Sequence, residues 1–291
     1  MFKDFLMLTK PGIIMGNLIA AISGLLLASQ GNIDFYLLLF MSLGVSLVIA
    51  SGCIFNNYID RDIDIKMSRT KNRALAQGRV SVFSALLLAT VTGFIGFYLL
   101  YSQTNLMAVL FGAIGFLVYV GFYSLRYKRS SVHGTLIGSL SGACPPVIGY
   151  VSVTGAFDAG AAILLLTFCF WQIPHSYAIA ICRFKDYQAA NIPVLPVEYG
   201  VETARKHMMV YIVAFAIAAL LLAERGYAGN IYALTVSVMS LYWLYLVKVG
   251  YHVQAESAWG RKLFVFSIVT ITVFSVLISV DYVVHPVQTF S

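Results

Sequence analysis

The chain has 291 residues, of which 60% are hydrophobic and only 11% are charged, and its mean hydropathy is +0.85. Soluble domains contain roughly 45–50% apolar residues, so this composition excludes an ordinary soluble protein and indicates a chain that lies in a lipid bilayer. The net charge of +7 fits the basic loops of a membrane protein and does not indicate a nucleic-acid partner.

Nine apolar stretches are long enough to cross about 30 Å of hydrocarbon, which takes roughly 20 helical residues. They are continuously apolar, whereas a membrane β-barrel needs alternating segments of about ten residues. The predicted spans are residues 12–29, 36–57, 81–101, 105–123, 133–153, 160–182, 207–224, 228–250 and 263–284. The sequence therefore predicts an all-α polytopic membrane protein with a single domain over residues 1–291. The loop positions also suggest a four-helix pseudo-repeat followed by a ninth helix.

Basic residues gather on one side of the predicted membrane. With a cytoplasmic N-terminus, 18 of the 19 Lys and Arg residues fall in inward segments, and only Arg225 falls outside. The positive-inside rule predicts this asymmetry. We therefore expect a bacterial inner-membrane protein with its N-terminus in the cytoplasm and its C-terminus outside, and we expect function at the long inward loops 58–80 and 183–206.

The first long inward loop opens with acids directly behind an apolar span, in the stretch NNYIDRDID. If the second helix continues to about residue 64, Asn56, Asp60 and Asp64 project from one helix face at a spacing of four. Asp62 then points away, as a solvated or Arg-paired acid. Like charges at this spacing repel, and Mg²⁺ suits carboxylate oxygens together with the oxygens of a substrate phosphate. The pattern predicts a metal site on this face.

Cations follow these acids in the segment KMSRTKNR, and their side chains suit phosphate oxygens. They are Lys66, Arg69, Lys71 and Arg73. The alternative is a solvated loop whose basic residues only set the membrane topology, which we favour for Lys66 and Arg79. We do not favour this alternative for Asn56, Asp60 and Asp64, because acids spaced along one helix face are poor topology signals.

Two later stretches combine ionisable and aromatic side chains. In YSLRYKRSSVH, the basic residues suit topology alone, but a ring such as Tyr123 beside them could also face a developing carbocation. In WQIPHSYAIAICRFKDYQ, Asp186 is the sole acid, and His175 lies about three helical turns, or about 16 Å, deeper. A histidine in an apolar span is either bonded to a neighbouring helix or functional, and the sequence favours neither.

The combination resembles the intramembrane prenyltransferase superfamily that includes the ubiquinone, menaquinone and chlorophyll enzymes. The usual first motif of that superfamily is Asn-Asp-x-x-Asp-x-x-x-Asp, and this chain has Asn56-Asn57-x-x-Asp60-x-x-x-Asp64, with Asn57 in place of one acid. The stretches Met67-x-Arg69-Thr70-x-x-Arg73-Ala74-Leu75 and Thr9-Lys10-Pro11-Gly12 also look like the superfamily's.

Three further stretches look most like the branch of the superfamily that farnesylates heme. They are Tyr123-Ser124 with Lys128-Arg129, then Gly142-Ala143-Cys144-Pro145-Pro146, and then Trp171-Gln172-x-Pro174-His175 leading to Asp186-Tyr187 and Pro193-Val194-Leu195-Pro196. The second motif commonly carries another acid four residues after the first, but position 190 is Ala. Asn191 is a partial substitute, and the ligand number of any second metal ion stays open.

The resemblance implies a nine-helix bundle around a central cavity that opens toward the cytoplasmic side. It implies Mg²⁺ as cofactor, farnesyl diphosphate as donor and heme B as acceptor, with heme O as product. The implied catalytic residues are Asp60, Asp64 and Asp186, and the implied metal ligands are Asn56, Asp60, Asp64 and Asp186. The implied diphosphate partners are Lys10, Arg69, Arg73, Lys128, Arg129 and Lys185. Tyr123 would stabilise a cation, and His175 would contact heme as an iron ligand or at a propionate.

Two other functions compete with this one. A prenyltransferase for an aromatic acid or quinone precursor is opposed by the missing second-motif acid and by the stretch WQIPH. A non-catalytic heme carrier or transporter would use His175 and would need no Asn/Asp/Asp face beside an Arg-rich loop. The lipid bilayer is an expected partner, and a terminal oxidase or heme-delivery protein is a further candidate.

Overall fold

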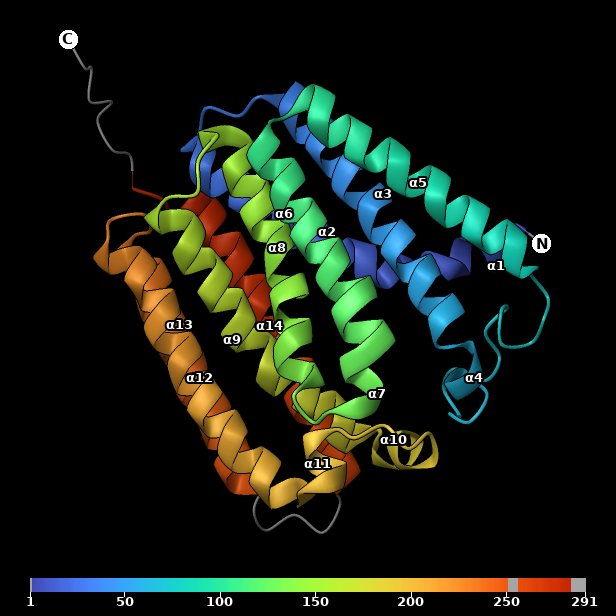
Figure 1. Ribbon diagram of the computed structural model, residues 1–291. Helices are drawn as coiled ribbons and strands as arrows, with labels where there is room; N and C mark the ends of the chain where they lie inside the picture. The colour runs from blue at the N-terminus through green and yellow to red at the C-terminus, as the bar shows by residue number, and fades with distance from the viewer. Residues whose placement is uncertain (1, 251–255, 284–291) are drawn as a thin grey trace.

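A computed structural model describes residues 2–250 and 256–283, which form a bundle of helices with no extended strand in those ranges (Figure 1). Within this part of the chain, nine helical segments are long and apolar enough to cross a membrane. They are Pro11–Ser29 (α2), Phe35–Ile59 (α3), Val82–Gln103 (α5), Leu106–Ser130 (α6, η1 and α7), Gly134–Thr154 (α8), Ala159–Cys182 (α9), Gly200–Glu224 (α12), Asn230–Val249 (α13) and Glu256–Val280 (α14). The predicted all-α membrane fold is confirmed.

Most helix ends lie within two residues of the predicted ends, but three spans differ. The fourth span continues to Ser130, and the seventh and ninth begin at Gly200 and Glu256 instead of residues 207 and 263. The added turns carry charged side chains such as Arg205, which an apolarity criterion excludes, although a helix can continue beyond the hydrocarbon layer. The predicted end of the ninth span at residue 284 lies outside the described residues.

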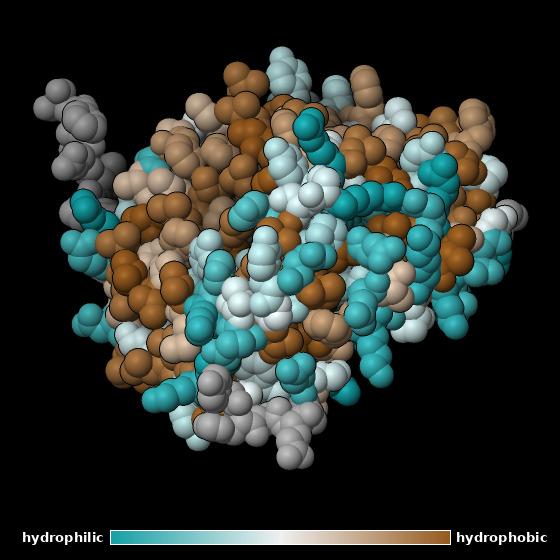
Figure 2. Space-filling model, turned by 60° about the horizontal axis from the view of Figure 1, so that its bottom comes forward, coloured by the Kyte–Doolittle hydropathy of each residue, from teal (hydrophilic) through white to brown (hydrophobic). Residues whose placement is uncertain are grey.

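Short helices cap one end of the bundle. They are Arg61–Asp64 (α4), Phe184–Ala189 (α10) and Leu195–Glu198 (α11), and they lie around the lower ends of the long helices in Figure 1. A further short helix, Phe2–Leu8 (α1), precedes α2. Figure 2 shows this end tilted forward, with polar side chains gathered across its centre between apolar flanks. Arg225, just after α12, lies at the opposite end.

The central helices α2 and α8 approach each other backbone to backbone. A Cβ atom added at Gly149 would lie 1.8 Å from the carbonyl oxygen of Ala21, and one added at Gly24 would lie 2.0 Å from that of Pro146. Glycine at a helix interface permits such an approach in membrane bundles. Pro146 lies inside α8, which is helical from Gly134 to Thr154 without interruption. This contact fixes α8 against the start of the chain.

The glycines at every fourth position of α8 contact three different neighbours. A Cβ at Gly138 would lie 3.2 Å from the ring of Tyr123, and one at Gly142 would lie 1.8 Å from the amide oxygen of Gln172. One at Gly134 would lie 2.9 Å from the carbonyl oxygen of Tyr127. This face of α8 therefore packs closely against its neighbours, and the packing at Gly138 places the Tyr123 ring.

The fourth span changes its helical type before it reaches the loops. It begins as the α-helix Leu106–Phe116 (α6), continues as the π-helix Leu117–Tyr127 (η1) and ends in Lys128–Ser130 (α7). π-helices are rare in proteins, but those that occur often lie at functional sites. The Ser124 hydroxyl donates to the carbonyl of Tyr119, five residues earlier, at 2.7 Å. This wider helix directs the side chains of Ser124 and Lys128 toward the end of α3.

Candidate active site

The acidic stretch bends at Asp60. Helix α3 ends at Ile59 and α4 begins at Arg61. The assumption that one continuous helix runs to about residue 64 is therefore wrong. Asp60 nevertheless keeps a nearly helical backbone, with φ −86° and ψ −1°, and the amide of Asp64 donates to its carbonyl at 2.8 Å. The spacing of four therefore survives the bend. The side chains of Asp60 and Asp64 are 1% and 4% exposed, whereas that of Asp62 is 62% exposed.

Asp60 and Asn56 form the centre of a buried polar cluster. The Asn56 amide donates to Asp60 Oδ2 at 2.8 Å and to the Ser124 hydroxyl at 2.9 Å. Lys128 Nζ donates to the same oxygen of Asp60, and Lys10 Nζ donates to Asn56 Oδ1. The cluster therefore joins the residue before α2, the end of α3 and the end of the fourth span.

The other two acids of the stretch are each paired with arginine. Arg73 Nη1 donates to both oxygens of Asp64, at 2.9 and 2.7 Å. The Arg129 guanidinium donates to both oxygens of Asp62, at 2.8 and 2.7 Å, and lies 3.9 Å from Asp60 Oδ1. The hydrogen bonds from Arg129 lower the pKa of Asp62 to about 2. Asp62 therefore points away from the buried face, as the sequence predicted, and of the two states left open for it, solvated or Arg-paired, the structure shows the pairing with Arg129.

Asp186 brings the second long loop to the first. The Ser68 backbone amide and hydroxyl both donate to Asp186 Oδ1, at 2.8 and 2.6 Å. Burial raises the pKa of this carboxyl, but the hydrogen bonds from Ser68 hold it below its ordinary value. Ile63 and Ile192 belong to one apolar cluster between the two loops. The two predicted acidic motifs therefore meet in space.

Two carboxylate oxygens in this region fit a metal ion. Asp60 Oδ1 and Asp186 Oδ2 are buried and receive no hydrogen bond from the described residues. An unsatisfied buried carboxylate oxygen is costly, and such oxygens are ligands for hard divalent cations. Residues 2–250 and 256–283 hold no ready group of three or more His, Cys, Asp or Glu side chains at metal-binding spacing. The donor set therefore suits Mg²⁺, which usually takes one or two carboxylates and completes its shell with water and phosphate.

The six predicted diphosphate partners fall into two groups. Four contact the acidic stretch: Lys10, Arg73, Lys128 and Arg129. The other two, Arg69 and Lys185, are exposed. Burial lowers the pKa of Lys10 to about 8, and the nearby charges of Arg73 and Lys128 contribute to the shift. The site therefore concentrates positive charge around its acids, as recognition of a diphosphate requires.

Tyrosine rings line the cluster. Tyr123 stacks on Tyr119, with ring centroids 6.2 Å apart and an interplanar angle of 15°. Burial raises the pKa of Tyr187, and the nearby Tyr123 adds to the shift. The Tyr119 carbonyl accepts from the Ser124 hydroxyl, which in turn accepts from the Asn56 amide, so the Tyr119 and Tyr123 pair lies beside the buried cluster. An aromatic face at this position is suited to stabilise positive charge.

His175 lies between α9 and α14 and contacts a different set of residues. Its Nδ1 is 2.7 Å from the Ser267 hydroxyl, and its ring stacks on Trp171 with centroids 4.6 Å apart. The Trp171 indole donates to the Ser267 carbonyl at 2.8 Å, and Phe264 lies 5.2 Å from the histidine ring. The hydrogen bonds described for His175 do not join it to the acids. Its contact with heme stays a prediction.

Three polar residues have roles that the sequence did not predict. Ser68 orients Asp186, and Ser124 orients the Asn56 amide. Asn57, which stands in place of one acid of the first motif, donates to the carbonyl oxygens of Leu8 and Cys53 and ties α1 to α3. A serine carries no spacing signal by itself, and only the motif that contains Tyr123-Ser124 could have suggested Ser124.

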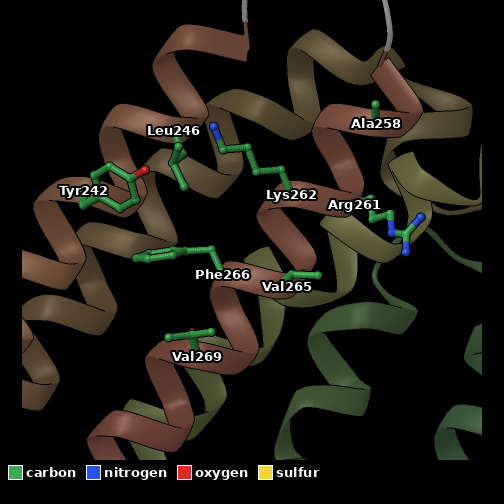
Figure 3. A pocket seen from close by; sticks show the side chains of 8 residues that line it. All are labelled: Tyr242, Leu246, Ala258, Arg261, Lys262, Val265, Phe266 and Val269. Atoms are coloured by element: carbon green, nitrogen blue, oxygen red, sulfur yellow. The ribbon is translucent and has the colours of Figure 1, made fainter.

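A separate open groove of about 430 Å³ lies between α13 and α14 (Figure 3). Its walls are apolar, with Tyr242, Leu246 and Phe266 among them, and Arg261 and Lys262 are its basic residues. None of the predicted site residues lines it. This groove is therefore distinct from the carboxylate and cation cluster.

A buried cluster of carboxylates and cations at one end of nine membrane helices suits a transferase whose apolar substrate carries a diphosphate. The chain belongs to the UbiA prenyltransferase family, whose model matches residues 17–269. It is 61% identical to the protoheme IX farnesyltransferase of Klebsiella pneumoniae subsp. pneumoniae over 284 residues, which cover 98% of this chain and 96% of that protein.

Two solved structures share the fold. The first is digeranylgeranylglyceryl phosphate synthase, with a TM-score of 0.78 and 19% identity over 96% of this chain and 98% of that one. The second is a UbiA homolog from Archaeoglobus fulgidus bound to DMAPP and Mg²⁺, with a TM-score of 0.74 and 17% identity over 95% of this chain and 99% of that one. The helical fold of the described residues is therefore shared with both structures.

Proposed function

We propose that this protein transfers the farnesyl group of farnesyl diphosphate to a vinyl group of heme B, giving heme O and diphosphate, with Mg²⁺ as its cofactor. The choice of heme and farnesyl substrates is supported by the 61% identity to a protoheme IX farnesyltransferase over nearly the whole chain. The observation that carries the chemistry is the buried Asp60, which has one oxygen bonded to Lys128 and the other without a hydrogen bond from any described residue.

The proposed metal ligands are the residues whose oxygens gather at the bend after α3 and at the second loop. They are Asn56, Asp60, Asp64 and Asp186. Mg²⁺ held there supplies charge neutralisation on the leaving diphosphate. The proposed diphosphate partners are Lys10, Arg69, Arg73, Lys128, Arg129 and Lys185. Four of them already lie within contact distance of the acidic stretch, so few side chains need to move far.

In the proposed reaction the allylic C–O bond of farnesyl diphosphate breaks, and its electron pair leaves with the diphosphate. Lys128 and the other cations bind that charge, while the ring of Tyr123 faces the positive allylic carbon. The π electrons of a heme vinyl group then form the new C–C bond. Water adds to the cation left beside the porphyrin and loses a proton, which leaves a hydroxyl group. Burial of the site keeps water from the allylic cation until that bond forms.

The apolar farnesyl chain is proposed to lie in a cavity among the spans that opens toward the cytoplasmic side, and His175 is proposed to contact heme. The protein is a multi-pass membrane protein. We place it in a bacterial inner membrane with a cytoplasmic N-terminus and an outer C-terminus, because the loops at one end carry nearly all of its Lys and Arg residues. A terminal oxidase or a heme-delivery protein is the class of partner that heme O and heme B would require.

Mass spectrometry of porphyrins tests the proposal. Purified protein is incubated with heme B, farnesyl diphosphate and Mg²⁺, and a parallel sample contains excess chelator. We expect hydroxyethylfarnesyl heme only in the sample with free metal, while binding of heme itself survives chelation. A folded preparation that binds both substrates and forms no such product would contradict the heme acceptor, and aromatic acids and quinone precursors would then be tried. Heme binding with no transfer to any acceptor would favour a carrier.

A further inference from the structure

The cations near the acids bind the same carboxylate and amide groups that the proposed metal ion would use. Lys128 donates to Asp60 Oδ2, and Arg73 donates to both oxygens of Asp64. Lys10 donates to Asn56 Oδ1. Each proposed ligand of the first motif is therefore bonded to a side chain that is also a proposed diphosphate partner. A divalent ion at Asp64 would compete directly with Arg73, which binds both oxygens of that acid. A divalent ion at Oδ1 of Asp60 would lie next to the charged Lys128 on Oδ2 of the same carboxylate.

The charges in this cluster determine which species can enter it. Asp60 and Asp64 face three cations, Lys10, Arg73 and Lys128, and Arg129 is already paired with Asp62. With Asp186, the third proposed carboxylate ligand, the group holds three negative and three positive charges, so a divalent ion alone would leave it with two uncompensated positive charges. Uncompensated charge in such a place is expensive. A complex of the ion with a diphosphate brings net negative charge instead, and it offers oxygens to the displaced cations.

The displaced side chains have room to move. The Lys128 and Arg73 side chains are 15% and 27% exposed, against 1% and 4% for their carboxylate partners. Lysine carries its charge on a flexible four-carbon stem, and arginine can bind phosphate oxygens in pairs. The acids are held by buried backbone, while the cations reach them from the edge of the site. Exchange therefore requires movement of the cations and not of the acids.

Building on the proposed function, we propose that Lys128 and Arg73 are exchangeable counter-ions that make metal binding dependent on diphosphate. By pairing with Asp60 and Asp64, the two cations disfavour binding of a divalent ion that arrives without a diphosphate. When the ion arrives with a diphosphate, they transfer to the diphosphate oxygens and release the carboxylates to the metal. Metal and diphosphate therefore bind with strong positive coupling, which must be equal in both directions.

Binding of Mn²⁺, followed by electron paramagnetic resonance of the free ion, tests this exchange without turnover. The titrations are made in the absence of heme, with and without farnesyl diphosphate. We compare the native chain with Lys128→Gln, Lys128→Arg and Arg73→Gln. Lys66→Gln is the matched control, since it removes a cation from the same loop that is exposed and outside the proposed machinery.

We expect Lys128→Gln to bind Mn²⁺ alone at least about tenfold more tightly than the native chain, because a charge-assisted hydrogen bond to the carboxylate is gone. The increase in Mn²⁺ affinity caused by farnesyl diphosphate should shrink in the same variant. Arg73→Gln should behave alike, while Lys128→Arg and Lys66→Gln should match the native chain.

The exchange would be overturned if both Gln variants, with native-like thermal unfolding, bound Mn²⁺ alone no more tightly than the native chain. It would also be overturned if farnesyl diphosphate raised Mn²⁺ affinity equally in all five proteins. These outcomes are separate from the proposed reaction, because the native chain can form heme O with or without such coupling. Conversely, coupling without heme O formation would support the exchange and contradict the heme acceptor.

Discussion

Ser68 donates two hydrogen bonds to one oxygen of Asp186, at 2.6 and 2.8 Å, although 118 positions separate the two residues. These bonds fasten the loop after α3 to the loop after α9. They occupy Oδ1 and leave Oδ2 of the carboxylate without a hydrogen bond from the described residues. Ser68 is therefore a positioning residue that leaves one oxygen of Asp186 free, and the proposed role of Asp186 as a metal ligand depends on it.

Ser68→Ala should weaken metal use more than it weakens the fold. The Ser68 amide remains as a donor, but loss of the hydroxyl lets the carboxylate rotate. Loss of such a supporting bond typically costs about 10–100-fold in metal affinity. We expect the Mg²⁺ concentration for half-maximal product to rise by about this factor, with the maximal rate recovered at high Mg²⁺. Ser68→Thr keeps a hydroxyl and should behave as the native chain. Equal Mg²⁺ dependence in all three proteins would show that Ser68 only joins the loops.

Asp60→Asn and Asp64→Asn should each lower product formation by about a hundredfold or more, as loss of a group that stabilises transition-state charge does. The variants should still insert into the membrane, since the nine apolar spans are unchanged. Asp62→Asn is the control, because that carboxylate is exposed and pairs with Arg129. Membrane fractions and heme O yield are measured together. Near-normal turnover in both buried variants would remove the metal role from this pair.

The features that follow from local sequence were predictable. Apolar length alone identified nine spans, and the spacing of four alone placed Asp60 and Asp64 on the buried side with Asp62 outside. The bend at Asp60 did not disturb this pattern, because its backbone stays near the helical region. Apolar length could not predict helix ends that extend beyond the hydrocarbon layer. Helix α12, for example, begins at Gly200, before the predicted start at residue 207.

The partners of the acids were beyond the reach of sequence spacing. Lys128 and Asp60 are 68 positions apart, and nothing local indicates that the π-helix would bring Lys128 to this carboxylate. The basic residues of these loops obey the topology rule whether or not they bind an acid. Sequence reasoning therefore found the cations as a group and could not assign Lys128 to Asp60 or Arg73 to Asp64.

His175→Ala should reduce the use of heme while binding of farnesyl diphosphate is retained. The ring is held by Ser267 and Trp171, away from the hydrogen bonds of the acidic cluster. We expect a higher heme concentration for half-maximal rate and an unchanged dissociation constant for farnesyl diphosphate. The variant Ser267→Ala distinguishes contact of His175 with heme from a role of His175 in helix packing. It removes the hydrogen-bond partner of Nδ1 and leaves the imidazole ring in place. If both variants lost heme use equally with lower thermal stability, His175 would be a packing residue of the α9 and α14 contact.

Gly149→Ala should destabilise the bundle, because its Cβ would lie 1.8 Å from the backbone oxygen of Ala21, which cannot move without a shift of α2. Overpacking of this kind costs ~1–3 kcal/mol, more than the helix propensity that alanine gains. Gly16→Ala is the matched control on α2, where a Cβ meets nothing within 4 Å. Thermal unfolding in detergent should fall for the first variant and not for the second. Since Lys10 directly precedes α2 and bonds Asn56, a shifted α2 should also weaken diphosphate binding, whereas unchanged stability in Gly149→Ala would show that the two helices can separate freely.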